Sequence, residues 1–178
     1  MTRLIGLLLL LSTFNSIAQE AVKPRPSPLS IASSRYKDNY VKILYSQPHK
    51  RGREIFGKLV PYGEVWRTGA NEATEITFTK DIMVNNTLVR AGTYSFFTIP
   101  EKDNWTVVIN SELGLWGAYN YNSKLDVLRF QVPVQSLNDV VYEAFTINID
   151  QKSDKADILL MWENVKVSVP IQFIDIKP

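Results

Sequence analysis

Residues 82–109, with the sequence IMVNNTLVRAGTYSFFTIPEKDNWTVVI, decide the fold class. They contain four short runs rich in β-branched and aromatic residues, which favour strands. Asn85 and Asn86 separate the first two runs, and asparagine tolerates the positive φ that a two-residue hairpin turn requires. Residues 100–104 separate the last two runs with turn-forming residues. This stretch therefore predicts two consecutive β-hairpins.

Alternating runs continue on both sides of these hairpins, as in half-buried strands. They cover residues 40–45, 74–79, 127–132, 145–149, 158–162 and 165–169. Turn residues recur about every 8–12 residues, and no well-capped helical pattern interrupts them. We expect an all-β protein, an antiparallel β-sandwich or jelly-roll-like fold with long loops and little helix.

The N-terminal residues 1–18 have the pattern of a signal peptide. Arg3 precedes the apolar run 4–11, and Ser16 and Ala18 place small residues at the −3 and −1 positions of a cleavage site. An uncleaved membrane anchor is the alternative, but a spanning helix needs about 20 apolar residues and polar residues end this run too early. We predict cleavage after Ala18 and a periplasmic or secreted protein.

The mature chain is predicted to begin with a flexible arm. Residues 19–39 are rich in Pro, Ser and Lys, and three prolines at every second position from Pro24 to Pro28 exclude a helix. The alternation that starts at Tyr40 marks the first expected strand. We therefore divide the chain into a signal peptide (1–18), a Pro-rich arm (19–39) and one β-domain (40–178).

Charge and cysteine content exclude several classes of partner. Without Arg3, the 20 Lys and Arg become 19 against 18 Asp and Glu, a net charge of +1. A nearly neutral chain without a long basic stripe does not match a nucleic-acid-binding protein. Because the chain has no Cys, it lacks the residue that would carry an N-terminal lipid anchor. We expect no stable membrane insertion after cleavage.

Several blocks of this sequence resemble the secreted bacterial family called domain of unknown function 2911. The blocks are YSQP at 45–48, RGR at 51–53, IFG at 55–57, LVPYG at 59–63, VWRTGANEAT at 65–74, AGTYSFFTIP at 91–100, WGAY at 116–119 and DVLR at 126–129. The likeness covers about residues 27–171. It implies export and a shared fold, and it transfers no catalytic residue. Where this chain has Gln47, the family pattern has Arg.

Residues 66–72, in a long Gly-rich loop, form the first candidate ligand-binding group. An aromatic face beside an Arg fork and adjacent amide and carboxylate groups suits a sugar or a polar metabolite. The candidate residues are Trp66, Arg67, Asn71 and Glu72. In the alternative reading, Trp66 belongs to the core and Arg67 pairs with Glu64 or Glu72 to satisfy a buried loop.

The second candidate group lies in the irregular stretch 111–124. Trp116, Tyr119 and Tyr121 stand among Gly and Asn residues and would form a stacking platform for a sugar ring. Aromatic side chains also bury large areas without any ligand, so anchoring of this loop is the alternative.

Signals for catalysis are weak. His49 is the only histidine and no Cys is present, which excludes a metal site built from several His or Cys ligands. No nucleophile elbow, phosphate loop or dinucleotide fingerprint occurs, so we expect no metal and no cofactor. A carboxylate pair is a further option, but Glu72 and Glu75 are three residues apart and would face opposite sides of a strand.

The sequence thus leans towards a binding protein rather than an enzyme. Our first hypothesis is an exported module that binds a glycan or another polar cell-envelope component. The second is a hydrolase that uses Glu72 or Asp126 with Arg67. The third is an envelope protein whose apolar loops contact a protein partner or form a homodimer.

Overall fold

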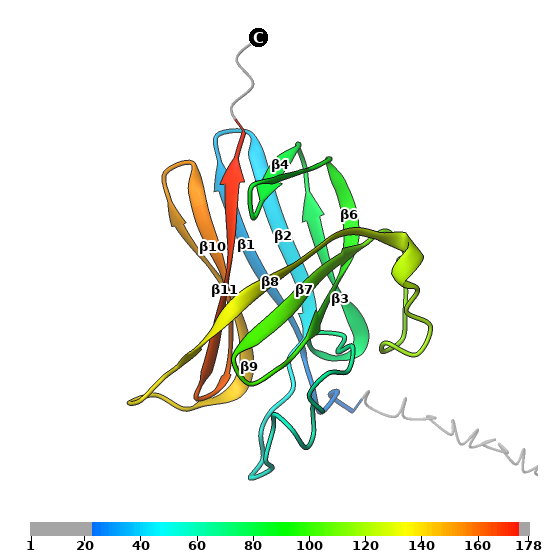
Figure 1. Cartoon of the computed structure of the whole chain (residues 1–178), viewed down its shortest axis with the longest axis vertical. Coiled ribbons are helices and arrows are strands. Elements are labelled where there is room, and N and C mark those ends of the chain that lie inside the picture. Colours follow the sequence, from blue (N-terminus) through cyan, green and yellow to red (C-terminus); the bar gives the residue numbers. More distant parts are fainter. Residues whose placement is uncertain (1–22, 175–178) are drawn as a thin grey trace, which may run out of the picture.

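The computed structural model describes residues 23–174 (Figure 1). The predicted signal peptide and its cleavage site lie outside these residues. The described part contains eleven strands and one short 3-10 helix. The strands are β1 Leu29–Tyr36, β2 Asn39–Ser46, β3 Ala70–Phe78, β4 Ile82–Val84, β5 Thr87–Val89, β6 Gly92–Ile99, β7 Asn104–Asn110, β8 Asp126–Ser136, β9 Tyr142–Lys152, β10 Lys155–Glu163 and β11 Val165–Phe173. The 3-10 helix η1 covers Ser123–Leu125.

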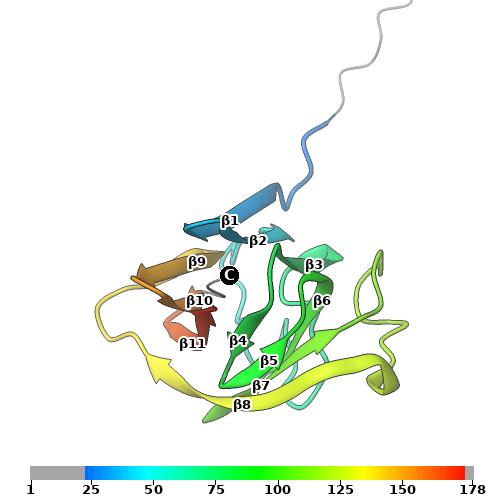
Figure 2. The same ribbon diagram turned by 90° about the horizontal axis from the view of Figure 1, so that it is seen from above.

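The strands form one antiparallel sheet in the order β1-β2-β3-β6-β7-β8-β11-β10-β9, and the β4–β5 hairpin pairs with β11 through β4. The all-β, antiparallel prediction is therefore confirmed. The sandwich or jelly-roll prediction is not, because the sheet curls until its two ends approach each other and nearly closes into a barrel (Figure 2). Strand number and turn spacing are alike in sandwiches and barrels, so the sequence pattern did not separate them.

Two non-local contacts produce this closure. The long strand β8 pairs with β7 through residues 126–133 and with β11 through residues 134–136, so it carries the sheet around a bend. At the opposite side, the chain that follows β2 pairs with the start of β9. There the N–H of Phe145 donates to the carbonyl of Pro48 at 2.8 Å, and the N–H of Lys50 donates to the carbonyl of Glu143 at 2.7 Å.

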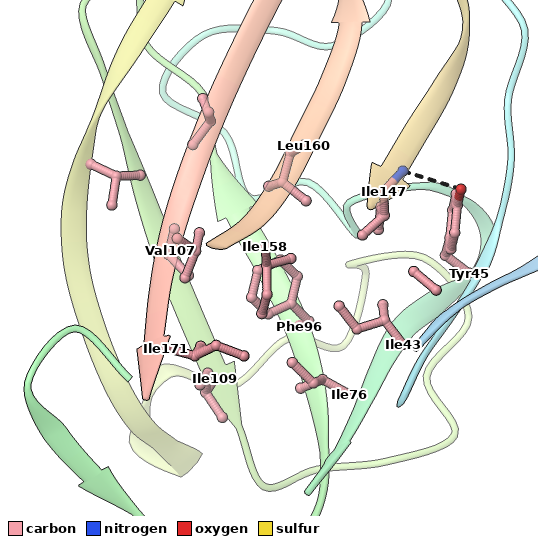
Figure 3. Packing of buried hydrophobic residues seen from close by; sticks show 14 of the residues in the cluster. Ile43, Tyr45, Ile76, Phe96, Val107, Ile109, Ile147, Ile158, Leu160 and Ile171 are labelled. Carbon is pink, nitrogen blue, oxygen red and sulfur yellow. Dashed lines mark hydrogen bonds between the residues drawn. The ribbon is translucent and has the colours of Figure 1, made fainter. Parts of the chain in front are cut away.

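The core fills the interior of the barrel (Figure 3). Alternate residues of nearly every strand point inward, among them Ile43, Phe96, Val107 and Ile158, which are fully buried. The hydroxyl of Tyr45 accepts a hydrogen bond from the N–H of Ile147 at 3.1 Å and so links β2 to β9 (Figure 3). This inward alternation explains why period-two patterning predicted the strands.

The N-terminal boundary of the β-domain was predicted too late. The arm was expected to extend to residue 39, but β1 spans Leu29–Tyr36 and pairs with β2 along its whole length. Its outward residues Leu29 and Ile31 are exposed, and Ala32 is its single buried residue. Because β1 is an edge strand held by backbone pairing to β2, its sequence carries little hydrophobic signal.

Both predicted hairpins are confirmed. β4 pairs with β5 and β6 pairs with β7. Asn85 and Asn86 have φ values of 45° and 61°, the left-handed conformation that a two-residue turn between right-twisted strands requires.

Candidate functional site

The loop 47–69 lies at one end of the barrel, the lower end in Figure 1. Its aromatic side chains Phe56 and Trp66 are buried in the core. Trp66 is 9% exposed and packs against Trp105, Phe145 and Trp162. Its backbone pairs with Thr98 of β6, and its indole N–H donates to the carbonyl of Gly69 at 3.1 Å. Trp66 is thus a core residue with its polar group satisfied, as in the alternative reading of the sequence.

The loop 111–125 lies on the outer face of the sheet, beside β3 and β6 (Figure 2). Leu115 covers a small second cluster formed by Ala73, Phe97 and Val108. The N–H of Ala73 donates to the carbonyl of Leu115, and the N–H of Gly117 donates to the carbonyl of Asn71, both at 2.9 Å. Backbone pairing therefore fixes this loop against the start of β3.

An irregularity at the start of β3 controls where its side chains point. Ser46 pairs with Ala70 and Leu44 with Glu75, so one residue of β2 lies opposite four residues of β3. Asn71 has φ 57° in this segment. As in other bulges, the extra residues disturb the simple alternation of side chains. Glu72 and Glu75 consequently line the same hollow, and the prediction that they face opposite sides was wrong.

The first hollow, of about 380 Å³, lies between the two loops. Its lining includes Leu59 and Glu64 from the first loop and Tyr119 from the second. The half-buried side chain of Arg67 also lines it and makes one long hydrogen bond, from Nη1 to the carbonyl of Asn71 at 3.4 Å. Among residues 23–174, Arg67 forms no ion pair with Glu64, Glu72 or any other carboxylate.

The second hollow, of about 440 Å³, lies on the other side of the loop 111–125, over β1, β2 and β3. Leu29, Leu44 and Leu115 give it an apolar lining. Glu72 reaches it and forms an ion pair with Arg25 at 2.7 Å. The N–H of Glu72 itself and the Arg25 guanidinium lower the pKa of the Glu72 carboxyl.

Two of the three predicted platform residues are exposed. Trp116 is 58% exposed and Tyr119 is 81% exposed, although the loop between them is fixed by Gly117. Tyr121 differs, because its ring packs on Phe97 and its hydroxyl donates to the Asp126 carboxylate at 2.7 Å. Burial, followed by this contact with Asp126, raises the pKa of Tyr121. Tyr121 therefore anchors the loop.

The predicted site residues are neighbours in space, but they do not share one cavity. Trp66, Arg67 and Tyr119 line the first hollow, whereas Glu72 lines the second. Asn71 and Trp116 lie between the two groups: Asn71 bonds to Gly117, and the backbone of Trp116 forms a bridge with Glu72.

Within residues 23–174, no three His, Asp or Glu side chains gather closely enough to hold a metal ion. In that same part of the chain, no helix is long and apolar enough to cross a membrane. The only histidine, His49, forms a backbone bridge with Ala144 where the barrel closes.

A family model for a protein of unknown function, DUF2911, matches residues 27–171. The chain belongs to the DUF2911 family. The matched region begins just before β1 and ends within β11, so the DUF2911 region includes the whole sheet except for the last residues of β11. Its first part contributes Leu29 of the second hollow, and its last residue, Ile171, is the first of the three β11 residues that pair with β4. The chain matches no curated protein and no solved structure.

Most residues of the second hollow of this DUF2911 domain were not predicted from the sequence. Arg25 and Leu29 fall in the segment assigned to a flexible arm, and Leu115 stands in an irregular stretch beside the aromatic residues that drew attention. The signal that was available is the outer face of β2, where Leu44 is a large aliphatic residue between the polar residues Lys42 and Ser46 on the same side.

Proposed function

We propose that this protein is an exported, non-catalytic binding module that takes a glycan or a similar polyhydroxylated envelope component at the first hollow. The observation that carries the proposal is the exposure of two large aromatic rings, Trp116 and Tyr119, on a loop that is otherwise pinned to the sheet. Export and a periplasmic or secreted location are part of this proposal and rest on the leader pattern of residues 1–18.

The exposed rings support a binding role because exposing large aromatic surface to water is unfavourable unless something covers it. Tyr119 borders the hollow, and the anchored Gly117 holds its segment in place. A rigid loop loses little conformational entropy when a ligand binds. A sugar ring, with an apolar face and polar edges, suits such a surface.

Arg67 supports the same proposal. Arg67 lines the hollow. Its guanidinium has five N–H donors and uses one of them in a long hydrogen bond to the carbonyl of Asn71. Glu64 lies in the same lining and supplies acceptors. Donors and acceptors at fixed positions beside an aromatic ring allow hydroxyl groups to be recognised by direction.

The hydrolase hypothesis receives less support. A general acid needs a pKa near or above the working pH, whereas the pKa of Glu72 is lowered by its own N–H and by Arg25. Asp126 accepts hydrogen bonds from Tyr121, Asn110 and Arg129, and it lines neither hollow. The proposed carboxylates are thus engaged elsewhere.

The test is binding of the mature protein to an array of neutral and uronic-acid-bearing oligosaccharides, followed by calorimetry with the best binder. We expect Arg67→Ala to weaken binding by about 10- to 160-fold, the range that corresponds to loss of charge-assisted hydrogen bonds worth about 1.5–3 kcal/mol. Tyr119→Ala should weaken the binding of the same ligand. It should leave the melting temperature nearly unchanged, because the Tyr119 side chain is exposed.

Arg90→Ala is the matched control, since Arg90 is a largely exposed arginine paired with Asp81 at a distant hairpin. It should bind as the wild type does. The proposal is wrong if no oligosaccharide binds the wild type, or if Arg67→Ala lowers the melting temperature strongly and leaves binding intact.

A further inference from the structure

The second hollow is a separate cavity that the proposed function does not use. It has a volume of about 440 Å³, within the range of small-molecule sites. Leu29 of β1, Leu44 of β2 and Leu115 of the loop 111–125 converge on it from three elements. Leu29 is 61% exposed, so this apolar surface is open to a ligand.

Two carboxylates face this apolar surface. The irregular start of β3 turns Glu72 to the same side as Glu75. Glu75 accepts one long hydrogen bond, at 3.5 Å, from the N–H of Gly114, and among residues 23–174 it forms no ion pair. The hollow therefore has an apolar wall and an anionic rim with an available carboxylate.

Among the described residues that line this hollow, Arg25 is the one cation. Arg25 lies before β1, and its guanidinium contacts the Glu72 carboxylate at 2.7 Å. Both side chains are substantially exposed, 58% for Arg25 and 45% for Glu72, so their ion pair contributes little free energy and is readily exchanged. The segment that carries Arg25 does not depend on this ion pair for its position, because the N–H of Gln47 donates to the carbonyl of Pro28 at 2.8 Å. Arg25 is thus a replaceable internal cation.

We propose that this hollow binds a small amphipathic amine. The aliphatic or aromatic body of the ligand packs on Leu29, Leu44 and Leu115, and its ammonium group lies between Glu72 and Glu75. The Arg25 side chain moves away from Glu72 as the ligand enters. This inference stands on the second hollow alone and does not depend on the glycan proposal.

Charge complementarity selects the class of ligand. Apolar contact by itself would accept a neutral alcohol and an amine of equal length equally well. The two carboxylates favour the amine and repel a carboxylic acid, since a charged group placed beside a like charge loses free energy. Screening by salt acts on an exposed rim, so the preference for the amine should weaken as ionic strength rises.

The experiment compares octylammonium, octanol and octanoate as probes of the mature protein by calorimetry and by methyl NMR of its leucines. We expect octylammonium to bind at least tenfold more tightly than octanol, and octanoate not to bind. Glu75→Gln should weaken the binding of octylammonium about tenfold. Arg25→Ala should strengthen its binding several-fold, because the internal cation that competes for Glu72 is removed. Glu101→Gln, at a surface carboxylate outside this hollow, is the matched control and should leave the affinity unchanged.

Equal affinity for octylammonium and octanol would overturn the proposal, as would an affinity that Glu75→Gln does not change. An unchanged affinity in Arg25→Ala would refute the role of the internal cation. The side chains of Arg25 and Glu75 are at least partly exposed, so variants at these two positions should fold. Their melting temperatures check that they do. Arg25→Lys supplies a second test, because a retained cation should preserve most of the competition.

Discussion

The loops 47–69 and 111–125 are both long, irregular and aromatic, yet the fold uses them in opposite ways. The first places Trp66 and Phe56 inside the barrel end, each 9% exposed, whereas the second leaves Trp116 and Tyr119 in solvent. Their path explains the difference. Both loops join neighbouring strands, β2 to β3 and β7 to β8. The first extends over the barrel end, where its backbone pairs with the start of β9, while the second folds back on the outer face of the sheet and packs on the cluster around Phe97.

This contrast indicates that aromatic content alone does not mark a binding surface. An aromatic side chain in a loop is buried when the loop crosses a mouth of the barrel that must be filled. When the loop has no such mouth to fill, a few small anchors suffice to hold it, here Leu115, Ala118 and Tyr121 over the outer cluster. Aromatic residues beyond those anchors are then available to ligands.

The largest expected difference is in how much an aromatic side chain of each loop contributes to the stability of the protein. Trp66→Ala should lower the free energy of unfolding by about 3–5 kcal/mol, because it leaves a cavity among Phe56, Trp105 and Trp162. Trp116→Ala should change it by no more than about 0.5 kcal/mol, the usual range for exposed positions. Urea denaturation measures both, and similar losses in the two variants would contradict the assignment of the loops.

A second prediction concerns the anchor of the outer loop. Leu115→Ala should cost about 2 kcal/mol, the lower end for buried leucines, since it removes the cover of Ala73 and Phe97. Amide hydrogen exchange should then increase within residues 111–125 while β10 and β11 stay protected. Uniformly faster exchange across the barrel would show that the outer cluster is not a separate unit.

Substitution of Gly117 should have a smaller effect on stability and should also change ligand binding. It has φ +71°, and a Cβ atom there would lie 2.8 Å from the Tyr119 ring and 3.0 Å from Nη1 of Arg67. Gly117→Ala should cost about 1 kcal/mol through this backbone conformation and displace both side chains. Calorimetry with the best oligosaccharide should show weaker binding than in Gly52→Ala, a control with positive φ and no close neighbours.

The smallest effect is the pH response of the Arg25 contact. The pKa of Glu72 is lowered from its ordinary 4.5, first by its own backbone N–H and then by the Arg25 guanidinium. The Arg25 part of this stabilisation is present above the ordinary pKa and disappears as the pH falls through the lowered pKa. Because the pair is exposed, the contribution should stay under about 1 kcal/mol. NMR titration of the Arg25 side chain should show release in acid, and Glu72→Gln should abolish that transition.

Some parts of the candidate site could be predicted from the sequence, and others could not. The two hairpins and the alternating runs follow from local patterning, and so does the prediction of the two loops as the regions of interest. The separation of Arg67 from Glu72 does not, because it depends on how β3 meets β2. A pairing of one residue against four leaves no signature in the residues of β3 alone. The same irregularity brings Glu75 to the hollow that Glu72 lines.

The sequence by itself determined the all-β class, the turn at Asn85 and Asn86, and the family, because these depend on interactions between residues close in the chain or on quoted blocks of residues. The tertiary structure decided the rest. Closure of the sheet relies on β8 pairing with two strands and on Pro48 meeting Phe145, contacts between residues far apart in the chain. Such pairings are set by the twist and packing of the whole sheet. They also decide which aromatic rings are buried and which remain in solvent.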